Sequence, residues 1–150
     1  MRSKSVLLIF VSAALVSLPL MGCQSLGFES LGLDRYSKYM MGEIPDQYVA
    51  QANPLPFNEE NILEGKRLYR EHCILCHGVT GRGDGELSTQ LSPRPANLIL
   101  TRTLPIASDA FFIWAISEGG EPFDSGMPSF SGSLSKKQIW QITRYVKSGI

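Results

Sequence analysis

The sequence has little charge and no excess of either sign. Its 14 Lys and Arg residues balance 14 Asp and Glu residues, and charged residues make up only 19% of the chain. Because a nucleic-acid-binding protein normally carries a basic excess to neutralise phosphates, this composition argues against that class. A length of 150 residues suits one domain and argues against a multidomain enzyme. The apolar share of 43% is nevertheless that of a chain able to bury a core.

The N-terminus has the pattern of an export signal. Arg2 and Lys4 precede an uncharged, largely apolar stretch at 6–20, which is shorter than the roughly 20 residues that a membrane-spanning helix needs. We therefore favour a cleaved signal peptide, residues 1–22, over a transmembrane helix. The tetrapeptide Leu-Met-Gly-Cys that ends at Cys23 resembles the lipobox of bacterial lipoproteins, in which the cysteine is lipidated and becomes the new N-terminus. This resemblance implies a periplasm-facing lipoprotein, anchored in the inner rather than the outer membrane; the alternative is an ordinary signal peptide with Cys23 as a bystander.

The next segment, residues 23–57, is predicted to be a tether. Isolated glycines and prolines interrupt it, and it shows no sustained helical or strand periodicity. Its apolar residues are too numerous for a solvated linker, so part of the tether is expected to lie on the domain or on a partner. The sequence leaves open which of the two it contacts.

Three helices are predicted after the tether. Asn58 is a suitable N-cap for a helix over 59–72, Ser108 opens a second helix that stops at Gly119, and Ser135 forms a capping box with Gln138 for a third. No segment alternates convincingly enough to predict a strand. We therefore expect an all-α domain.

This domain, residues 58–150, has three main helices joined by long loops rich in glycine and proline. A domain of this size with such loops has too little apolar material to fill its own centre, so we expect something else to occupy it.

Cysteine and histidine are scarce, yet three of these residues form one motif, Cys73-x-x-Cys76-His77. Two thiols at this spacing can form thioethers to the vinyl groups of one haem, with the adjacent histidine as an axial ligand of the iron. A closed zinc site needs four ligands, usually from two such pairs, and beyond this motif the chain offers only His72 and Cys23, which form no second pair of that kind. A thioredoxin-like pair would need a βαβ context, and a disulfide across two residues would be strained.

Met127 is the predicted sixth ligand of the iron. It is the only methionine after the haem motif, and it precedes a proline in a glycine-rich loop. A rigid loop can direct a thioether towards a metal, whereas a methionine on a helix face more often fills a core. His72, the other histidine, is taken as a surface or outer-shell residue. Ligation by His77 and Met127 is typical of electron transfer.

Together these residues resemble the class I c-type cytochromes over 58–150. The resemblance rests on five motifs: Gly65-x-x-x-Tyr69-x-x-x-Cys73, the Cys-x-x-Cys-His motif with its following glycines, Pro95-Ala96-Asn97-Leu98, Ile116-x-x-Gly119 and Met127-Pro128-x-Phe130.

The resemblance implies the cytochrome c class I fold around one covalent haem c. It further implies that the Pro95 carbonyl, or alternatively that of Pro93, accepts a hydrogen bond from His77, and that Ile116 faces the haem. It also implies that Gly65 allows a close crossing by the C-terminal helix, with Tyr145 or Trp140 packing against it.

The function expected from this resemblance is one-electron transfer, without enzymatic activity of the chain itself. The lipobox and the tether resemble membrane-anchored cytochrome subunits of quinol-oxidising or terminal-oxidase complexes, including the small monohaem subunit of alternative complex III. The expected partners are therefore redox proteins, in particular a membrane oxidoreductase complex. Two alternatives stay open: a ligand sensor or peroxidase with a labile Met127, and a structural haem subunit. Candidate donors to the haem propionates are Arg94, Arg102 and Trp114.

Overall fold

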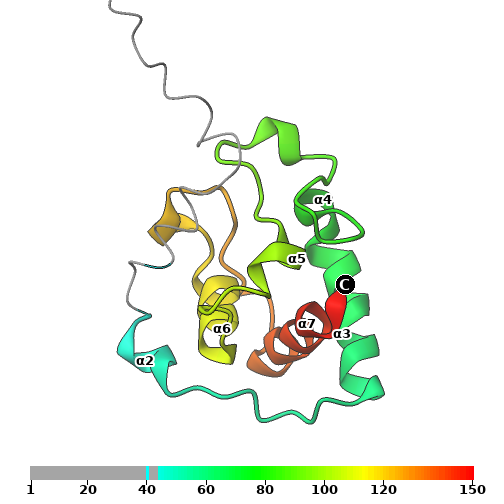
Figure 1. Ribbon diagram of the computed structural model, residues 1–150, viewed down its shortest axis with the longest axis vertical. Helices are drawn as coiled ribbons and strands as arrows, with labels where there is room; N and C mark the ends of the chain where they lie inside the picture. The colour runs from blue at the N-terminus through cyan, green and yellow to red at the C-terminus, as the bar shows by residue number, and fades with distance from the viewer. Residues whose placement is uncertain (1–39, 41–43) are drawn as a thin grey trace, which may run out of the picture.

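The computed structural model describes residue 40 and residues 44–150. The predicted signal peptide, its cleavage point and Cys23 lie outside these residues. The described part is helical and contains no strand, which confirms the predicted all-α fold (Figure 1). In chain order the elements are α2 (Asp46–Val49), α3 (Glu59–His72), α4 (Ile74–His77), η2 (Ser88–Gln90), α5 (Leu98–Thr101), α6 (Asp109–Glu118), η3 (Glu121–Phe123) and α7 (Lys136–Gly149).

None of the helices in the described residues is both long and apolar enough to span a bilayer.

The three long helices, α3, α6 and α7, begin where their caps predict. The Asn58 side chain accepts a hydrogen bond from the Asn61 amide at 3.1 Å, and the Ser108 hydroxyl accepts one from the Phe111 amide at the same distance. Ser135 forms the predicted capping box with Gln138. Each of these bonds satisfies an amide that the first helical turn leaves without an intrahelical partner. The predicted helix boundaries are therefore confirmed.

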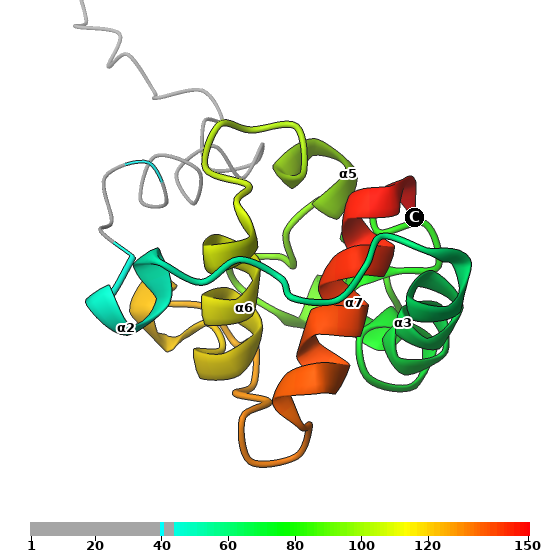
Figure 2. The same cartoon turned by 90° about the horizontal axis from the view of Figure 1, so that it is seen from below.

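Helices α3 and α7 pack closely side by side (Figures 1 and 2). At their crossing, a Cβ built on Gly65 would lie 2.0 Å from the Gln141 carbonyl oxygen and 2.9 Å from the Cβ of Tyr145. Only glycine permits this approach. The expected crossing at Gly65 is confirmed, and Tyr145 rather than Trp140 is the aromatic residue that meets it.

The end of the predicted tether, residues 44–57, is packed on the domain, and we call this segment the strap. Figure 2 shows the strap running from α2 across α6 and α7 to the start of α3. Its residues Tyr48 and Asn53 are buried. Asn58 caps the first long helix, which begins at Glu59, but packing against the domain already begins in the strap.

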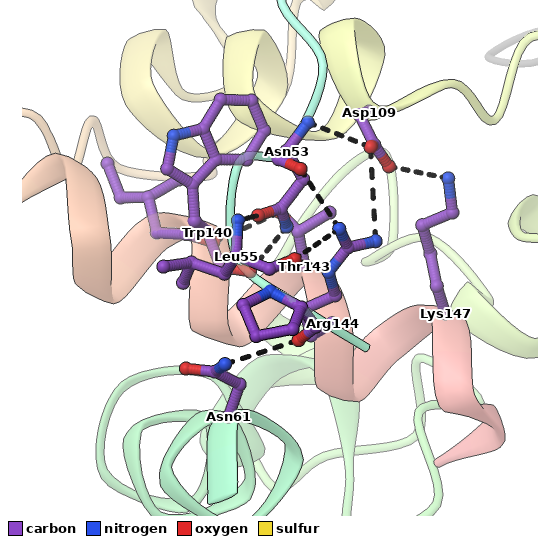
Figure 3. A network of polar contacts seen from close by, with 10 residues as sticks. Asn53, Leu55, Asn61, Asp109, Trp140, Thr143, Arg144 and Lys147 are labelled. Atoms are coloured by element: carbon purple, nitrogen blue, oxygen red, sulfur yellow. Dashed lines mark hydrogen bonds and ion pairs between the residues drawn. The ribbon is translucent and has the colours of Figure 1, made fainter. Parts of the chain in front are cut away.

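A polar network holds the middle of the strap to α6 and α7 (Figure 3). The Arg144 guanidinium donates to the carbonyl oxygens of Asn53 and Leu55, each at 3.0 Å. The Asn53 amide N–H donates to the Asp109 carboxylate at 2.9 Å, and the Asn53 side chain donates to the Trp140 carbonyl at 2.9 Å. The strap is therefore fixed through its backbone and through the Asn53 side chain, with two helices supplying the partners.

Asp109 is the charged centre of this network. Lys147 Nζ lies 2.6 Å from one carboxylate oxygen, and the Arg144 guanidinium lies 4.0 Å from the other. Burial alone would raise the pKa of Asp109, but the hydrogen bonds from Lys147 and Asn53 and the two positive charges together hold that pKa below its usual value. The carboxylate is thus kept ionised in the folded protein.

Candidate functional site

The cysteines and histidine of the Cys-x-x-Cys-His motif are placed by a short break between two helices. Cys73 ends α3 and also caps α4, so that its amide donates to the Tyr69 carbonyl and its carbonyl accepts from the His77 amide, each at 2.8 Å. The single turn of α4 then carries Cys76 and His77. The two cysteines are not joined in a disulfide. Both thiols and the imidazole line one pocket at the centre of the domain.

This pocket is lined mainly by apolar side chains from every long helix and from the loops between them. Leu91 and Leu98 come from the segment after the motif, Phe111, Phe112 and Ile116 from α6, and Ile142 and Val146 from α7. The predicted site residues Cys73, Cys76, His77, Pro95, Ile116 and Met127 all belong to its lining. The structure therefore brings together residues that lie up to 54 positions apart in the sequence. The hollow centre expected from the lack of core material is present.

The backbone carbonyl of Ala96 orients the His77 side chain. The side chain is buried, with 8% of its surface exposed, and its Nδ1 lies 3.0 Å from the Ala96 carbonyl oxygen. Because a carbonyl oxygen only accepts hydrogen bonds, Nδ1 carries the proton and donates it. In the neutral imidazole, Nε2 is then the nitrogen without a proton, as a metal ligand requires, and the bond to Ala96 also raises its basicity.

The carbonyl that accepts the hydrogen bond from His77 is that of Ala96 and not the expected one, which was that of Pro95 or alternatively that of Pro93. The Pro95 carbonyl oxygen instead lies against Gly83, 2.3 Å from the place where a Cβ would stand. The next carbonyl along the chain, that of Ala96, faces the imidazole. Pro95 and Pro93 contribute to the pocket lining without accepting this bond.

Met127 lies on a loop that is bonded to the end of α6. Its carbonyl accepts from the Gly120 amide at 2.8 Å, and three residues later the Phe130 amide donates to the Ile116 carbonyl at 3.1 Å. The loop thus places the half-buried Met127 in the pocket lining beside Ile116. Ligation of the iron by Met127 stays a prediction.

The glycine-rich loop after the motif folds back on α4. The amides of Gly83 and Gly85 donate to the carbonyls of His77 and Cys76 at 2.9 and 3.1 Å. These N–H groups are therefore used to hold the haem motif. A phosphate-binding loop would instead present its amides to the ligand.

Four further residues were considered near the haem, and only one of them, His72, lines the pocket. His72, which was expected to be a surface or outer-shell residue, is half-buried and contributes to the pocket lining, with its ring centroid 6.2 Å from that of Phe130. Arg94 and Arg102 are exposed and Trp114 is buried beside Phe111, and none of the three lines the pocket. Their proposed contact with haem propionates stays a prediction.

The chemistry of the pocket fits a covalently bound haem. Burial, together with the nearby Cys76, raises the pKa of Cys73 to about 12, which disfavours the thiolate form that a zinc ligand requires. Within residues 44–150, His, Cys, Asp and Glu side chains form no group of three that could hold a metal ion. The apolar lining, the paired thiols and an unprotonated imidazole nitrogen match what a haem c requires.

Comparisons with known proteins agree with this geometry. The family model described as "Cytochrome C oxidase, cbb3-type, subunit III" matches residues 60–146. The 1-butanol dehydrogenase (cytochrome c) of Thauera butanivorans is 29% identical over 92 residues, which are 60% of this chain and 11% of that protein. In a solved structure, a chain of the Kuenenia stuttgartiensis reducing HAO-like protein complex superposes with a TM-score of 0.56 at 32% identity, over 65% of this chain and 47% of that one.

The chain thus spans about a ninth of the curated relative and about half of the solved one. The likeness to both is confined to a part of each protein, while the family match takes in α3, α4, α6 and most of α7. The predicted class I cytochrome family, its fold and its covalent haem c are confirmed. Such a domain transfers electrons through its haem. With the haem motif and nearly all of the three long helices inside the matched region, the chain belongs to the c-type cytochrome family of cbb3-type oxidase subunit III.

Proposed function

We propose that this protein transfers single electrons at the surface of a bacterial membrane, through a haem c whose iron is ligated by His77 and Met127. A lipid on Cys23 would hold it at the membrane, where its redox partners would include an oxidoreductase complex of a respiratory or related chain. The observation that carries the proposal is the shared pocket, in which both ligand candidates and both thiols form parts of one apolar lining.

The residues of the pocket support this function in distinct ways. The bond from His77 to Ala96 fixes the imidazole and its tautomer, so that Nε2 needs no proton loss to bind iron. A neutral thioether at Met127 favours the reduced iron relative to a second histidine. When bound, haem c supplies a centre that gains or loses one electron. The apolar side chains around it keep water away and limit the reorganisation that each transfer requires.

The relatives favour a partner that is itself an oxidoreductase. One is a dehydrogenase whose name includes cytochrome c, and the other belongs to a multi-protein complex. Both proteins are longer than the part that matches this chain. A domain of this kind is therefore found together with oxidoreductases, which supports a role for this protein as their electron donor or acceptor.

Spectroscopy of the haem-loaded protein tests the ligation. Ferric wild type should show the weak far-red charge-transfer band of thioether-bound low-spin iron, and Met127→Ala should abolish it and lower the reduction potential, by on the order of 0.1 V. Met40→Ala is the matched control, because Met40 is exposed and lies outside the pocket lining.

An unchanged band in Met127→Ala would overturn the ligation. Ready binding of carbon monoxide or azide by wild type would favour the ligand sensor or peroxidase instead, since the sixth position would then be open.

A further inference from the structure

The last turn of α6 and the Met127 loop form one hydrogen-bonded unit. Besides the bonds from Gly120 to Met127 and from Phe130 to Ile116, the Ser129 hydroxyl donates to the Ser117 carbonyl at 2.6 Å. At Gly119, with a φ of 80°, the end of α6 and the Met127 loop approach so closely that a Cβ there would lie 2.7 Å from the Met127 carbonyl oxygen. Any movement of the last turn of α6 is therefore transmitted to the Met127 backbone.

The strap is attached to the same turn from its other side. Tyr48 is the one buried residue of α2, with 9% of its surface exposed, and its hydroxyl donates to the carboxylate of Glu118. Glu118 is the last residue of α6 and directly precedes Gly119. The Tyr48 hydroxyl thus donates to a carboxylate, and hydrogen bonds of this kind are stronger than those between neutral groups.

The strap also has a second attachment at the opposite end of α6. There Asn53 donates to Asp109, the first residue of the helix, and Arg144 holds the backbone on both sides of Pro54 (Figure 3). The strap therefore bridges α6 from its first residue to its last (Figure 2). Of these two attachments, only the bond from Tyr48 to Glu118 lies at the turn of α6 to which the Met127 loop is hydrogen-bonded.

We propose that Tyr48 and Glu118 are positioning residues for Met127. Docking of the strap at Glu118 holds the last turn of α6, and this turn holds the Met127 thioether in the pocket. When the strap is released at Tyr48, Met127 exchanges more readily with an external ligand. The strap precedes the matched region, residues 60–146. The part of the chain that leads towards Cys23 is thus coupled to an iron ligand through Tyr48, which lies outside that region and bonds to Glu118 within it. The inference rests on the proposed His77 and Met127 ligation.

The test is imidazole binding to the ferric, haem-loaded full chain, followed by loss of the far-red band. Tyr48→Phe keeps the ring and removes the donor, and it should increase the apparent imidazole affinity by roughly 3- to 10-fold, the effect of losing one charge-assisted hydrogen bond at a partly exposed site. Glu118→Ala should produce a similar increase. Glu118→Gln, which keeps an acceptor oxygen, should restore most of the wild-type affinity. Combining Tyr48→Phe with Glu118→Ala should add little, because both remove the same bond.

Tyr145→Phe is the control, since Tyr145 is equally buried but packs on α3, away from the strap. It should leave imidazole affinity unchanged even if it lowers the Tm. Wild-type affinity in both Tyr48→Phe and Glu118→Ala would overturn the inference, as would an equal increase in Tyr145→Phe, which would indicate general loosening. If Tyr48→Phe does not fold, Glu118→Ala and Glu118→Gln decide the question alone. A far-red band that disappears in Met127→Ala and is insensitive to Tyr48 would refute the positioning role while leaving the proposed function intact.

Discussion

Replacing Gly65 by alanine should destabilise the folded domain, although alanine is the better helix former. The added methyl would lie 2.0 Å from the Gln141 carbonyl oxygen, which is 1.4 Å short of the 3.4 Å at which ordinary contact begins. The atom it meets is backbone in the middle of α7, so no side-chain rotation can relieve the clash. Helix α7 as a whole has to move away from α3.

Two opposing terms set the magnitude of this effect. Alanine in place of glycine in a helix interior gains about 1 kcal/mol, whereas overpacking a tight core costs about 1–3 kcal/mol and sometimes more. Separation of α3 and α7 also loosens the pocket lining, to which Tyr69 contributes from α3 and Ile142 from α7. We therefore expect the upper end of the cost, a net loss of about 2 kcal/mol, which lowers the Tm by roughly 10 °C in a domain of this size.

Urea unfolding of the haem-loaded protein, followed by circular dichroism, measures this loss. Gly132→Ala is the matched control, because a Cβ at Gly132 has no heavy atom within 4 Å. It should change stability by less than about 1 kcal/mol. Equal midpoints for Gly65→Ala and wild type would refute the reasoning, since the helices would then separate without cost.

Three further predictions follow from the anchor, the haem motif and the strap. Acid-acetone extraction should leave the haem on the polypeptide through Cys73 and Cys76, and haem recovered in the organic phase would contradict covalent attachment. Cys23→Ser should block maturation or release a soluble protein with an unchanged haem spectrum, and sedimentation of this variant with salt-washed membranes would contradict the lipid anchor. Asp109→Asn should cost about 2 kcal/mol at pH 7. Because folding lowers the pKa of Asp109, this difference from wild type should persist above about pH 4 and fade as the folded-state carboxylate is protonated; a pH-independent difference in urea midpoint would argue against an ionic role.

The long helices could be predicted from the sequence because their signals are local. Asn58, Ser108 and Ser135 each bond to an amide three residues ahead, so the whole interaction fits within one turn. The haem motif is equally local, since both thiols and the imidazole lie within five consecutive residues. Short-range geometry of this kind depends little on the rest of the fold, and it therefore survives in the sequence as a recognisable pattern.

Docking of the strap could not be predicted in the same way. The bond from Asn53 to Asp109 spans 56 residues, and the bond from Arg144 to the Asn53 carbonyl spans 91. In the sequence, each of these polar residues is indistinguishable from a solvated one. The acceptor groups on the strap are moreover backbone carbonyls, which every residue has. Only the apolar content of the tether indicated that part of it would be packed, without indicating where.

The acceptor for His77 shows the same limit within the site itself. Resemblance located the correct segment but placed the carbonyl one residue too early, at Pro95 instead of Ala96. Successive carbonyls in an extended segment point in different directions, so the acceptor depends on how the segment is turned. Here that turn is set by the approach of Pro95 to Gly83, whose missing side chain leaves room for the Pro95 oxygen. The residue types could therefore indicate the candidate ligands. The orientation of His77, in contrast, depends on a close contact between the backbones of Pro95 and Gly83, which the sequence pattern does not reveal.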